Sequence, residues 1–452
     1  MKFLVPYQKC QNFAVLPLSF ILTISALLAC VSVTHAAPTE KLKLSMDEAY
    51  QLALAQSEAL QESQELILAA EAQYQQALAA LYPEIHILGT HRFRSSQNYG
   101  RLTGSTFSDD SSQGSNSSTG SRRSKPRDWS LTLRQPLFTG FRESLVADAR
   151  ESGLEAQRHL KVRQGELLYA DVARVYAQTA LYQRDDALLK RTEQVLSDRI
   201  TELEKFRTLG KAREGEIEAA LADKAAVSAS RAQNQGLLGT SRELLNFLTG
   251  KTITNEQFEL GVPSNLPSSQ PPQVEEAPSR YDIKAKQAQL NAATLERKAA
   301  ERGHLPTLFL EGNSYLYEEP DSNRDWEVLL KFDLPLFEGG ATQAAIAEYR
   351  AKERASQVRL KLQEREAIKE LKTAHVKLVS TRKELELIDV QRVAARKNLS
   401  AQRRDYELGL VTNLDVLAAI QQELEAERKY AGAQADLFIA HAELKVASGA
   451  VS

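Results

Sequence analysis

The sequence contains an internal duplication that organises most of its length. Trp129–Phe138 reads WSLTLRQPLF and is followed by Gly140, whereas Trp326–Phe337 reads WEVLLKFDLPLF and is followed by Gly339. The prolines of these two segments lie 199 residues apart, and the same offset relates later residues: Gly210 and Gly409, Ile217 and Val416, Ala219-Ala220 and Ala418-Ala419. Such self-similarity predicts two structural units that share one plan.

The offset is larger upstream of these segments. Tyr82-Pro83 and Leu305-Pro306 lie 223 residues apart, so the first copy holds 24 additional residues. They fall in a Ser- and Gly-rich stretch over 95–127, which has too few apolar residues to order itself and predicts an exposed loop. Five prolines predict an extended linker over 262–278, which separates a first repeat (37–261) from a second repeat (279–452).

Each copy predicts the order helix, strand, loop, strand, very long helix, turn and helix. In the first copy, Ser45 and Glu48 form a capping box that opens a helix running to about Ala80. A β-hairpin over 85–137 follows, with strands at 85–94 and 129–137. The second copy predicts a helix over 279–301 and a β-hairpin over 307–335, with strands at 307–317 and 326–334.

The long helices are the second constraint on the fold. Residues 141–207 contain no proline over 67 residues, which corresponds to roughly 100 Å of helix. Residues 341–406 repeat this pattern, and each stretch ends at a glycine turn (Gly210 and Gly409) before a returning helix of about 37 residues. The expected products are helical hairpins over 141–248 and 341–448. The short helix before each β-hairpin covers the remaining half of the long helix, so the fold class is mostly α with strands at one end.

Two of the four strands alternate between apolar and polar residues. Trp129, Leu131 and Leu133 share one face of the second strand, and Trp326, Val328, Leu330 and Phe332 share one face of the fourth. Alternation over nine to eleven residues is typical of a transmembrane β-strand, in which these side chains would face lipid. An amphipathic hairpin packed on a soluble core is the alternative, because the other two strands alternate poorly.

Four strands cannot close a barrel, and open strand edges are not tolerated in lipid. Closure would need several chains that share one barrel. Two chains would give eight strands and a side-chain-filled interior, whereas three would give twelve strands and a lumen. A shared barrel continued by long helices predicts a conduit.

The first 36 residues predict a secretory signal peptide. Lys2 and Lys9 precede a long apolar run, and Thr34-His35-Ala36 offers a cleavage site near Ala36. Two alternatives stay open. Leu27-Leu28-Ala29-Cys30 is a loose lipobox in which Cys30 would carry lipid, and the apolar run is long enough for a membrane anchor.

Several stretches resemble one known family when taken together and in order. They are LSMDEAYQLA from Leu44 to Ala53, Gly303-His304-Leu305-Pro306-Thr307, both PLF-x-G segments, and YELGLVTNLDVL from Tyr406 to Leu417. The chain thus resembles the TolC-like outer membrane efflux proteins. This resemblance implies a homotrimer in outer-membrane lipid, with a twelve-stranded barrel and an α-helical tunnel in the periplasm. It also implies docking to a periplasmic adaptor and an inner-membrane transporter (RND, ABC or MFS), in efflux or type I secretion.

The resemblance also assigns site residues at the helical tips. Tyr406 matches a gating tyrosine, and the alternative is a residue of the hydrophobic seam between helices near the turn. Asp415 matches a carboxylate that lines the periplasmic entrance, and the alternative is an acid that stabilises the start of a helix. Adaptor docking falls on the turn residues Leu209, Gly210, Gly409, Leu410, Val411 and Thr412. Two residues depart from the family pattern. Val411 stands where the family has a basic gate partner, and Ala418 stands where it has a second acidic ring. The hydrogen-bonding network of the gate is therefore not assigned.

The residues predict no catalytic chemistry. Lys and Arg (57) nearly balance Asp and Glu (59), which argues against a nucleic-acid partner. Gly250-Lys251-Thr252 lacks the upstream glycine of a phosphate-binding loop, and the closest histidines, His86 and His91, have no ligand partners at metal-site spacing. We therefore expect a non-enzyme without cofactor or metal. Drug, metal and protein cargo all remain open, and a soluble periplasmic coiled-coil scaffold or adaptor is the alternative function.

Overall fold

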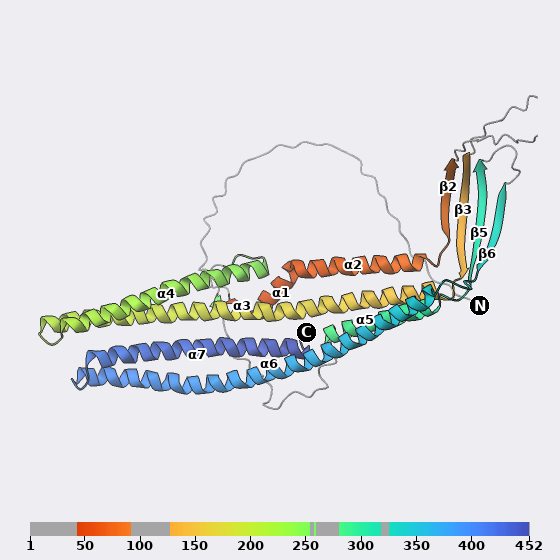
Figure 1. Ribbon diagram of the computed structural model, residues 1–452. Coiled ribbons are helices and arrows are strands. Elements are labelled where there is room, and N and C mark those ends of the chain that lie inside the picture. The colour runs from red at the N-terminus through yellow and green to blue at the C-terminus, as the bar shows by residue number, and fades with distance from the viewer. Residues whose placement is uncertain (1–42, 92–126, 254–256, 259–279, 318–324, 452) are drawn as a thin grey trace, which may run out of the picture. The chain divides into compact units, whose positions relative to one another are not determined.

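The computed structural model describes residues 43–91, 127–253, 257–258, 280–317 and 325–451 (Figure 1). The predicted signal peptide with Cys30, the linker over 262–278 and all but Arg127 of the loop over 95–127 lie outside the described residues. None of the helices in the described ranges is both long and apolar enough to cross a bilayer.

The first predicted helix is two helices. α1 spans Met46–Gln56 and α2 spans Glu58–Ala79, with a break at Ser57. The capping box at the start is confirmed, because the Glu48 amide donates to Ser45 Oγ and the Ser45 amide donates to Glu48 Oε2. The expectation of one continuous helix was wrong because Ser57 leaves helical geometry, at ψ 112°, and its hydroxyl caps α2 by accepting from the Leu60 amide.

The two long helical hairpins are confirmed to within a residue or two at the ends. α3 (Arg142–Thr208) returns as α4 (Glu214–Thr249), and α6 (Ala341–Glu407) returns as α7 (Asn413–Ser448). The turns need Gly210 and Gly409 at φ 70° and 74°, a left-handed conformation that only glycine adopts at little cost. A 6→1 hydrogen bond closes each turn, from the Lys211 amide to Phe206 and from the Leu410 amide to Asp405.

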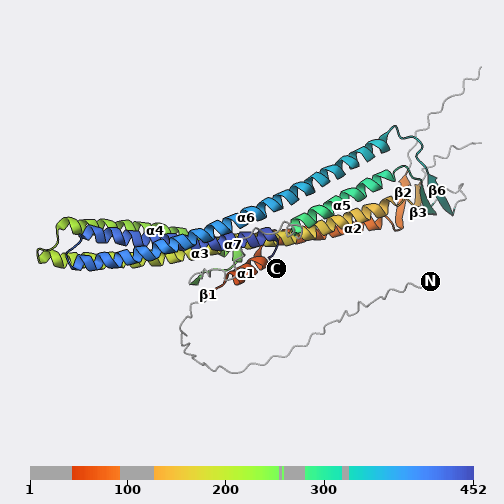
Figure 2. The ribbon, with the colours of Figure 1, turned by 90° about the horizontal axis from the view of Figure 1, so that it is seen from below.

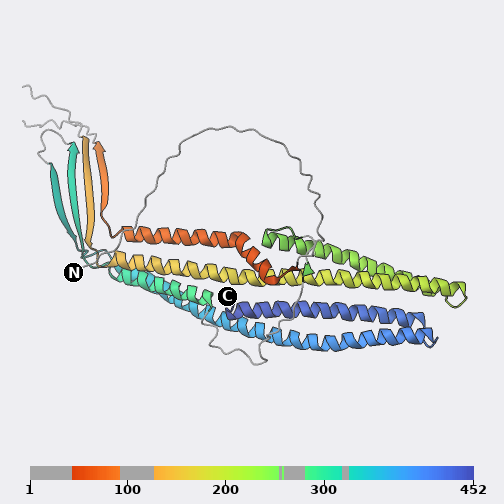
Figure 3. The ribbon, with the colours of Figure 1, turned by 180° about the vertical axis from the view of Figure 1, so that it is seen from behind.

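Short helices cover the half of each long helix that lies next to the strands. α2 lies beyond α4 along α3 (Figure 3), and α5 (Tyr281–Glu301) lies beside both α3 and α6 (Figure 2). The two repeats also meet directly, because α3 packs along α7. The predicted division of each long helix between two partners is therefore confirmed.

All four strands of the two hairpins join one antiparallel sheet at one end of the helices (Figure 1). The strands are β2 (Glu84–His91), β3 (Arg127–Phe138), β5 (Thr307–Tyr317) and β6 (Trp326–Asp333), in the order β2-β3-β5-β6. The two repeats are thus joined by the β3–β5 pairing. β2 and β6 form the two outer edges of this sheet.

A small parallel pair was not predicted. β1 (Lys43–Leu44) pairs with β4 (Gln257–Phe258) halfway along α3, and two residues are too short to produce a periodic signal. Tyr176 holds this pair to α3, since its hydroxyl donates to the Leu44 carbonyl at 2.7 Å and its ring packs edge-on against Phe258.

Glycines inside and at the ends of the helices should respond oppositely to substitution. Gly409→Ala is expected to destabilise the protein by about 1 kcal/mol, because a Cβ is strained at positive φ. Gly236→Ala, inside α4 with open space around the added methyl group, should instead stabilise it by about 0.5–1 kcal/mol. Thermal unfolding of the two variants measures this, and shifts of the same sign would contradict it.

Candidate functional site

One face of the sheet is apolar across all four strands. The residues predicted to face lipid on β3 and β6 lie on this face, and all are exposed in the single chain: Trp129, Leu131, Leu133, Trp326, Val328, Leu330 and Phe332. Ile85 and Ile87 of β2 join them, because they pair with Leu133 and Leu131. The alternation of β2 was missed because Leu88 interrupts it.

The other face carries a connected polar network. Thr132 Oγ1 donates to Asn313 Oδ1 at 2.7 Å, and the Asn313 amide donates to Glu327 Oε1 at 3.1 Å. Lys331 forms an ion pair with Glu311 at 2.7 Å on the same face. Leu88, Phe309 and Leu329 are apolar exceptions on this face. A sheet with one apolar and one charged face fits a boundary between lipid and water.

The helical tips are the second candidate site, and Arg199 joins the two hairpins there. Its guanidinium lies 3.8 Å from the ring centroid of Tyr406, its Nε donates to Asn413 Oδ1 at 2.8 Å, and its Nη1 donates to Glu202 at 2.7 Å. The Asn413 amide in turn donates to the Glu216 carbonyl. We call Arg199, Tyr406 and Asn413 the tip latch, since they connect α3, α6 and α7.

Tyr406 sits at the edge of an apolar tip cluster. Buried members come from both repeats: Leu196, Ile200, Leu203, Ile217, Val416, Leu417 and Ile420. Burial raises the pKa of the Tyr406 hydroxyl above its ordinary value of 10.0, so the ring is uncharged at neutral pH. Arg199 was not predicted, because it lies 207 residues from Tyr406 in the chain and has no local sequence signal.

Asp415 is exposed at the start of α7 and closes a capping box. Its Oδ2 accepts hydrogen bonds from the Thr412 hydroxyl at 2.6 Å and from the Thr412 amide at 2.8 Å. These bonds, with the hydroxyl contributing most, lower the pKa of Asp415 below its ordinary value of 3.8. Ala418 follows one turn later and is also exposed. The Asp415 side chain therefore stays ionised at this end of the molecule.

Both tip turns present apolar side chains to their surroundings. Leu209 and Leu410, predicted as docking residues, are largely exposed, as are Leu408 and Leu414, which were not predicted. Gly210, Gly409 and Thr412 are exposed as well, and Val411 is half-buried. The tips therefore present a small apolar surface.

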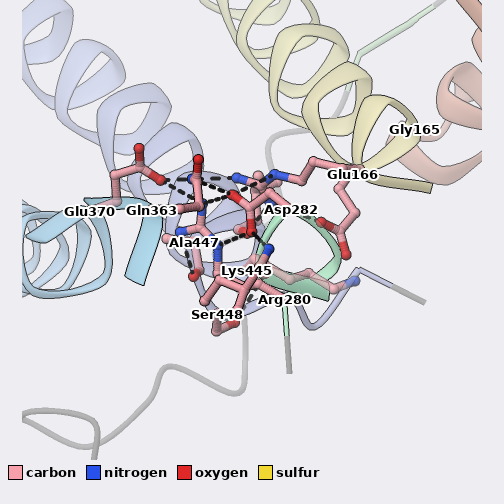
Figure 4. A network of polar contacts seen from close by, with 12 residues as sticks. Gly165, Glu166, Arg280, Asp282, Gln363, Glu370, Lys445, Ala447 and Ser448 are labelled. Carbon is pink, nitrogen blue, oxygen red and sulfur yellow. Dashed lines mark hydrogen bonds and ion pairs between the residues drawn. The ribbon is translucent and has the colours of Figure 1, made fainter. Parts of the chain in front are cut away.

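A buried ionic network ties the two repeats together where α7 ends (Figure 4). Arg280, only 1% exposed, donates to Asp282 Oδ2 at 2.5 Å, to Glu370 Oε2 at 2.8 Å and to the Ala447 carbonyl at 3.3 Å. Arg163 of α3 binds the neighbouring Val446 carbonyl at 2.9 Å. The two guanidinium groups thus donate to carbonyls in the last turn of α7, where the helix lacks its own amide donors.

Arg163 extends the network into the first repeat. It pairs with Glu166 at 2.8 Å and approaches Asp282 at 3.6 Å. Burial opposes ionisation of Asp282, but the bonds from Arg280 outweigh it and hold the pKa of Asp282 below its ordinary value of 3.8. Glu166 Oε1 lacks a hydrogen-bond partner among the described residues. The network spans four helices, so it fixes the α6–α7 hairpin to α3.

Removing one partner of this network should be costly. Arg280→Ala is expected to destabilise the protein by about 3–5 kcal/mol, because Asp282 and Glu370 each lose their shortest ion pair and the Ala447 carbonyl loses a donor. Arg174→Ala, which removes an exposed arginine from α3, should cost about 0–1 kcal/mol. Equal losses in chemical unfolding would show that the network is not the link between the repeats.

The same network predicts an acid limit to stability. A carboxylate whose pKa is lower in the folded state stabilises above its unfolded value and loses that contribution as pH falls through the folded value. The contribution of Asp282 should therefore be complete at neutral pH and disappear below about pH 3.8. Asp282→Asn should flatten this part of the stability–pH curve, and an unchanged slope would contradict the assignment.

Other candidate chemistry finds no support. Gly250 ends α4 at φ 66° and is preceded by helix, so Gly250-Lys251-Thr252 does not form a phosphate-binding loop. Among the described residues, no group of three or more His, Cys, Asp or Glu side chains is arranged to hold a metal ion.

Comparison with known proteins agrees with this geometry. Residues 275–450 match the family model described as outer membrane efflux protein. This part of the chain is therefore similar to that family, in agreement with the predicted resemblance. The match begins just before α5 and includes the second hairpin, the tip turn and α7. No curated protein sequence matches the chain.

Solved structures extend the likeness to almost the whole chain. CusC is 19% identical with a TM-score of 0.76, over 92% of this chain and 95% of that chain. The Vibrio cholerae outer membrane protein VceC is 19% identical with a TM-score of 0.73, over 89% and 96%. The Campylobacter jejuni CmeC outer membrane channel is 15% identical with a TM-score of 0.74, over 95% and 93%. These similarities establish the fold, including the first repeat that the domain match does not reach.

Proposed function

We propose that three copies of this chain form an export duct in the outer membrane, with the helices extending into the periplasm. The observation that carries this proposal is the sheet at one end of two long helical hairpins. It has one apolar face, one polar face and two edges that pair with no other strand in the described part of the chain. Three such sheets give a twelve-stranded barrel wide enough for a lumen. The polar network of Thr132, Asn313 and Glu327 then lines water, and the apolar face meets lipid.

The duct acts as a passive conduit of a tripartite efflux pump or type I secretion system. An inner-membrane transporter supplies the energy and the cargo, and a periplasmic adaptor joins the two proteins at the helical tips. The exposed leucines of the tip turns, including Leu209 and Leu410, are the proposed adaptor contacts. We expect no catalytic turnover. Among the described residues, no group of three or more His, Cys, Asp or Glu side chains could hold a metal ion.

Membrane fractionation followed by the native mass of the detergent-extracted protein tests the duct. We expect the protein in the outer membrane, with a mass of three protomers, because each sheet needs a neighbour on both edges. A soluble monomer or dimer in the periplasm would overturn the proposal and favour the coiled-coil scaffold.

The tip latch is the proposed gate, with Tyr406 as its moving part and Asp415 as an acid at the entrance. In a trimer, three Asp415 carboxylates around one axis would attract cations. Arg199 holds α6 and α7 against α3, and a cation–π contact and a hydrogen bond together contribute about 2 kcal/mol. A stabilisation of this size is small enough for an adaptor to overcome.

Releasing the latch should open the duct. Arg199→Ala is expected to raise single-channel conductance in planar bilayers, because α6 loses its contact to α3 at the tip. Arg403→Ala removes the same charge from an exposed site nearby that has no ion pair with any other described residue, and it should leave conductance unchanged. If both variants conduct as the unmodified protein does, the latch is not the gate.

A further inference from the structure

The two β-hairpins pair in the same register once their sequence offsets are applied. First strands of the two repeats differ by 223 residues and second strands by 199. Shifting the observed pair Glu84↔Arg134 by these offsets gives Thr307↔Asp333, which is the pair observed in the second hairpin. The two hairpins are therefore equivalent strand by strand and pair by pair.

One chain already shows how consecutive hairpins join. At the internal seam, β3 pairs with β5 through Leu133↔Gly312 and Gln135↔Leu310. The exit turn of the first hairpin packs on the residue that enters the second, since a Cβ at Gly140 would lie 2.9 Å from Leu305 Cβ. This seam joins the second strand of one hairpin to the first strand of the next.

At the two edges of the sheet, β6 and β2 each pair with a described strand on one side only, so the described residues hold no such seam there. We propose that β6 of one copy pairs with β2 of the next copy in the register of the internal seam, an inference that rests on the trimeric duct. The offsets convert Leu133↔Gly312 into Phe332↔Gly89 of the neighbouring copy, and Gln135↔Leu310 into Leu334↔Ile87 of that copy.

The apolar face provides an independent check on this register. Ile87 and Gly89 lie on the apolar face of β2, because they pair with Leu131 and Trp129. Phe332 lies on the apolar face of β6, since it pairs with Leu308 on the same side as Leu330. The derived register keeps apolar faces together, whereas a shift by one residue would place the apolar side chains of one copy beside the polar side of the next.

The register assigns a specific role to Gly89. The Trp129 ring lies over this glycine, because three ring atoms come within 3.1 Å of where a Cβ would stand. Phe332 of the neighbouring copy arrives from the other side and packs against Trp129 across Gly89. We call this contact the aromatic seam. Its counterpart Gly312 lies between Leu133 and Val328 of one chain, and a Cβ there would meet nothing within 4 Å.

The seam also explains two very exposed side chains after β6. Leu336 and Phe337 are 89% and 90% exposed in the single chain. Their counterparts at the internal seam, Leu137 and Phe138, are less exposed. Phe138 pairs with Leu308 and packs against the Phe141 ring, with 5.6 Å between the ring centroids. The offsets place Phe337 opposite Ile85 of the next copy, which covers it in the same way.

Disulfide formation between copies tests the register. The only cysteines of the chain are Cys10 and Cys30, so introduced cysteines have no competitor within residues 43–452. Oxidation of the Leu334→Cys/Ile87→Cys variant should convert it into covalently closed trimers, because directly paired positions meet disulfide geometry. The matched variant Leu334→Cys/Ile85→Cys, displaced by two residues on the same face, should not cross-link.

The outcomes separate the register from the duct. Cross-linking of the displaced pair in a protein with trimeric native mass would overturn the register and leave the duct standing. Absence of a trimer for the unmodified chain would remove both. Cross-linking of the direct pair alone supports the seam.

The glycines test the aromatic seam separately. Gly89→Ala should lower the temperature at which trimers dissociate in detergent, because its methyl group displaces the Trp129 ring. Gly312→Ala should leave that temperature nearly unchanged. Phe332→Ala in a Trp326→Phe background should shift Trp129 emission in trimers and leave it unshifted in dissociated chains. Equal changes of the dissociation temperature in the two glycine variants would overturn the aromatic seam. Trp129 emission in trimers that does not change on substitution of Phe332 would overturn it as well.

Discussion

The open edges of the four-stranded sheet are the constraint on which the rest of the molecule depends. β2 and β6 each present a row of backbone donors and acceptors on one side, and their apolar face suits lipid. In a hydrocarbon environment each unpaired backbone group costs several kcal/mol, whereas water would satisfy it at little cost. In the proposed trimer, other copies of the chain supply strands at these edges.

The helices hold each sheet in a position where closure is possible. α3 and α6 leave the sheet from β3 and β6 and run the length of their hairpins, so any rotation between the repeats would displace two strands together. Two contacts oppose such rotation. The ionic network around Arg280 fixes α7 to α3 and α5, and the tip latch around Arg199 fixes the far ends. The first network is centred on the buried Arg280, whereas the second consists of a few contacts of Arg199.

Much of this fold follows from local sequence patterns. The long proline-free stretches predicted α3 and α6, the alternation of Trp326–Asp333 predicted β6, and the duplication predicted that both repeats share one plan. The capping box at Ser45 was predictable because its partners lie three residues apart. Each of these signals is contained within a window of residues that are neighbours in the chain.

The remaining features depend on contacts between distant residues. Arg163 and Arg280 form hydrogen bonds with the end of α7 that join residues 283 and 167 positions apart in the chain. No local sequence pattern predicts contacts between residues so far apart. The break at Ser57 was missed because serine is tolerated within helices, and its capping bond decides the outcome. The polar face of the sheet shows the same limit, because Thr132 and Asn313 come from different repeats.

Electron cryomicroscopy of the detergent-extracted protein is the decisive test of the shared barrel, because it shows how many chains form it. We expect particles with three-fold symmetry, in which twelve strands close into a barrel at one end. The twelve helices of the hairpins α3–α4 and α6–α7 should form one tube. Particles with two-fold symmetry, or single rods whose sheets remain open in detergent, would contradict it.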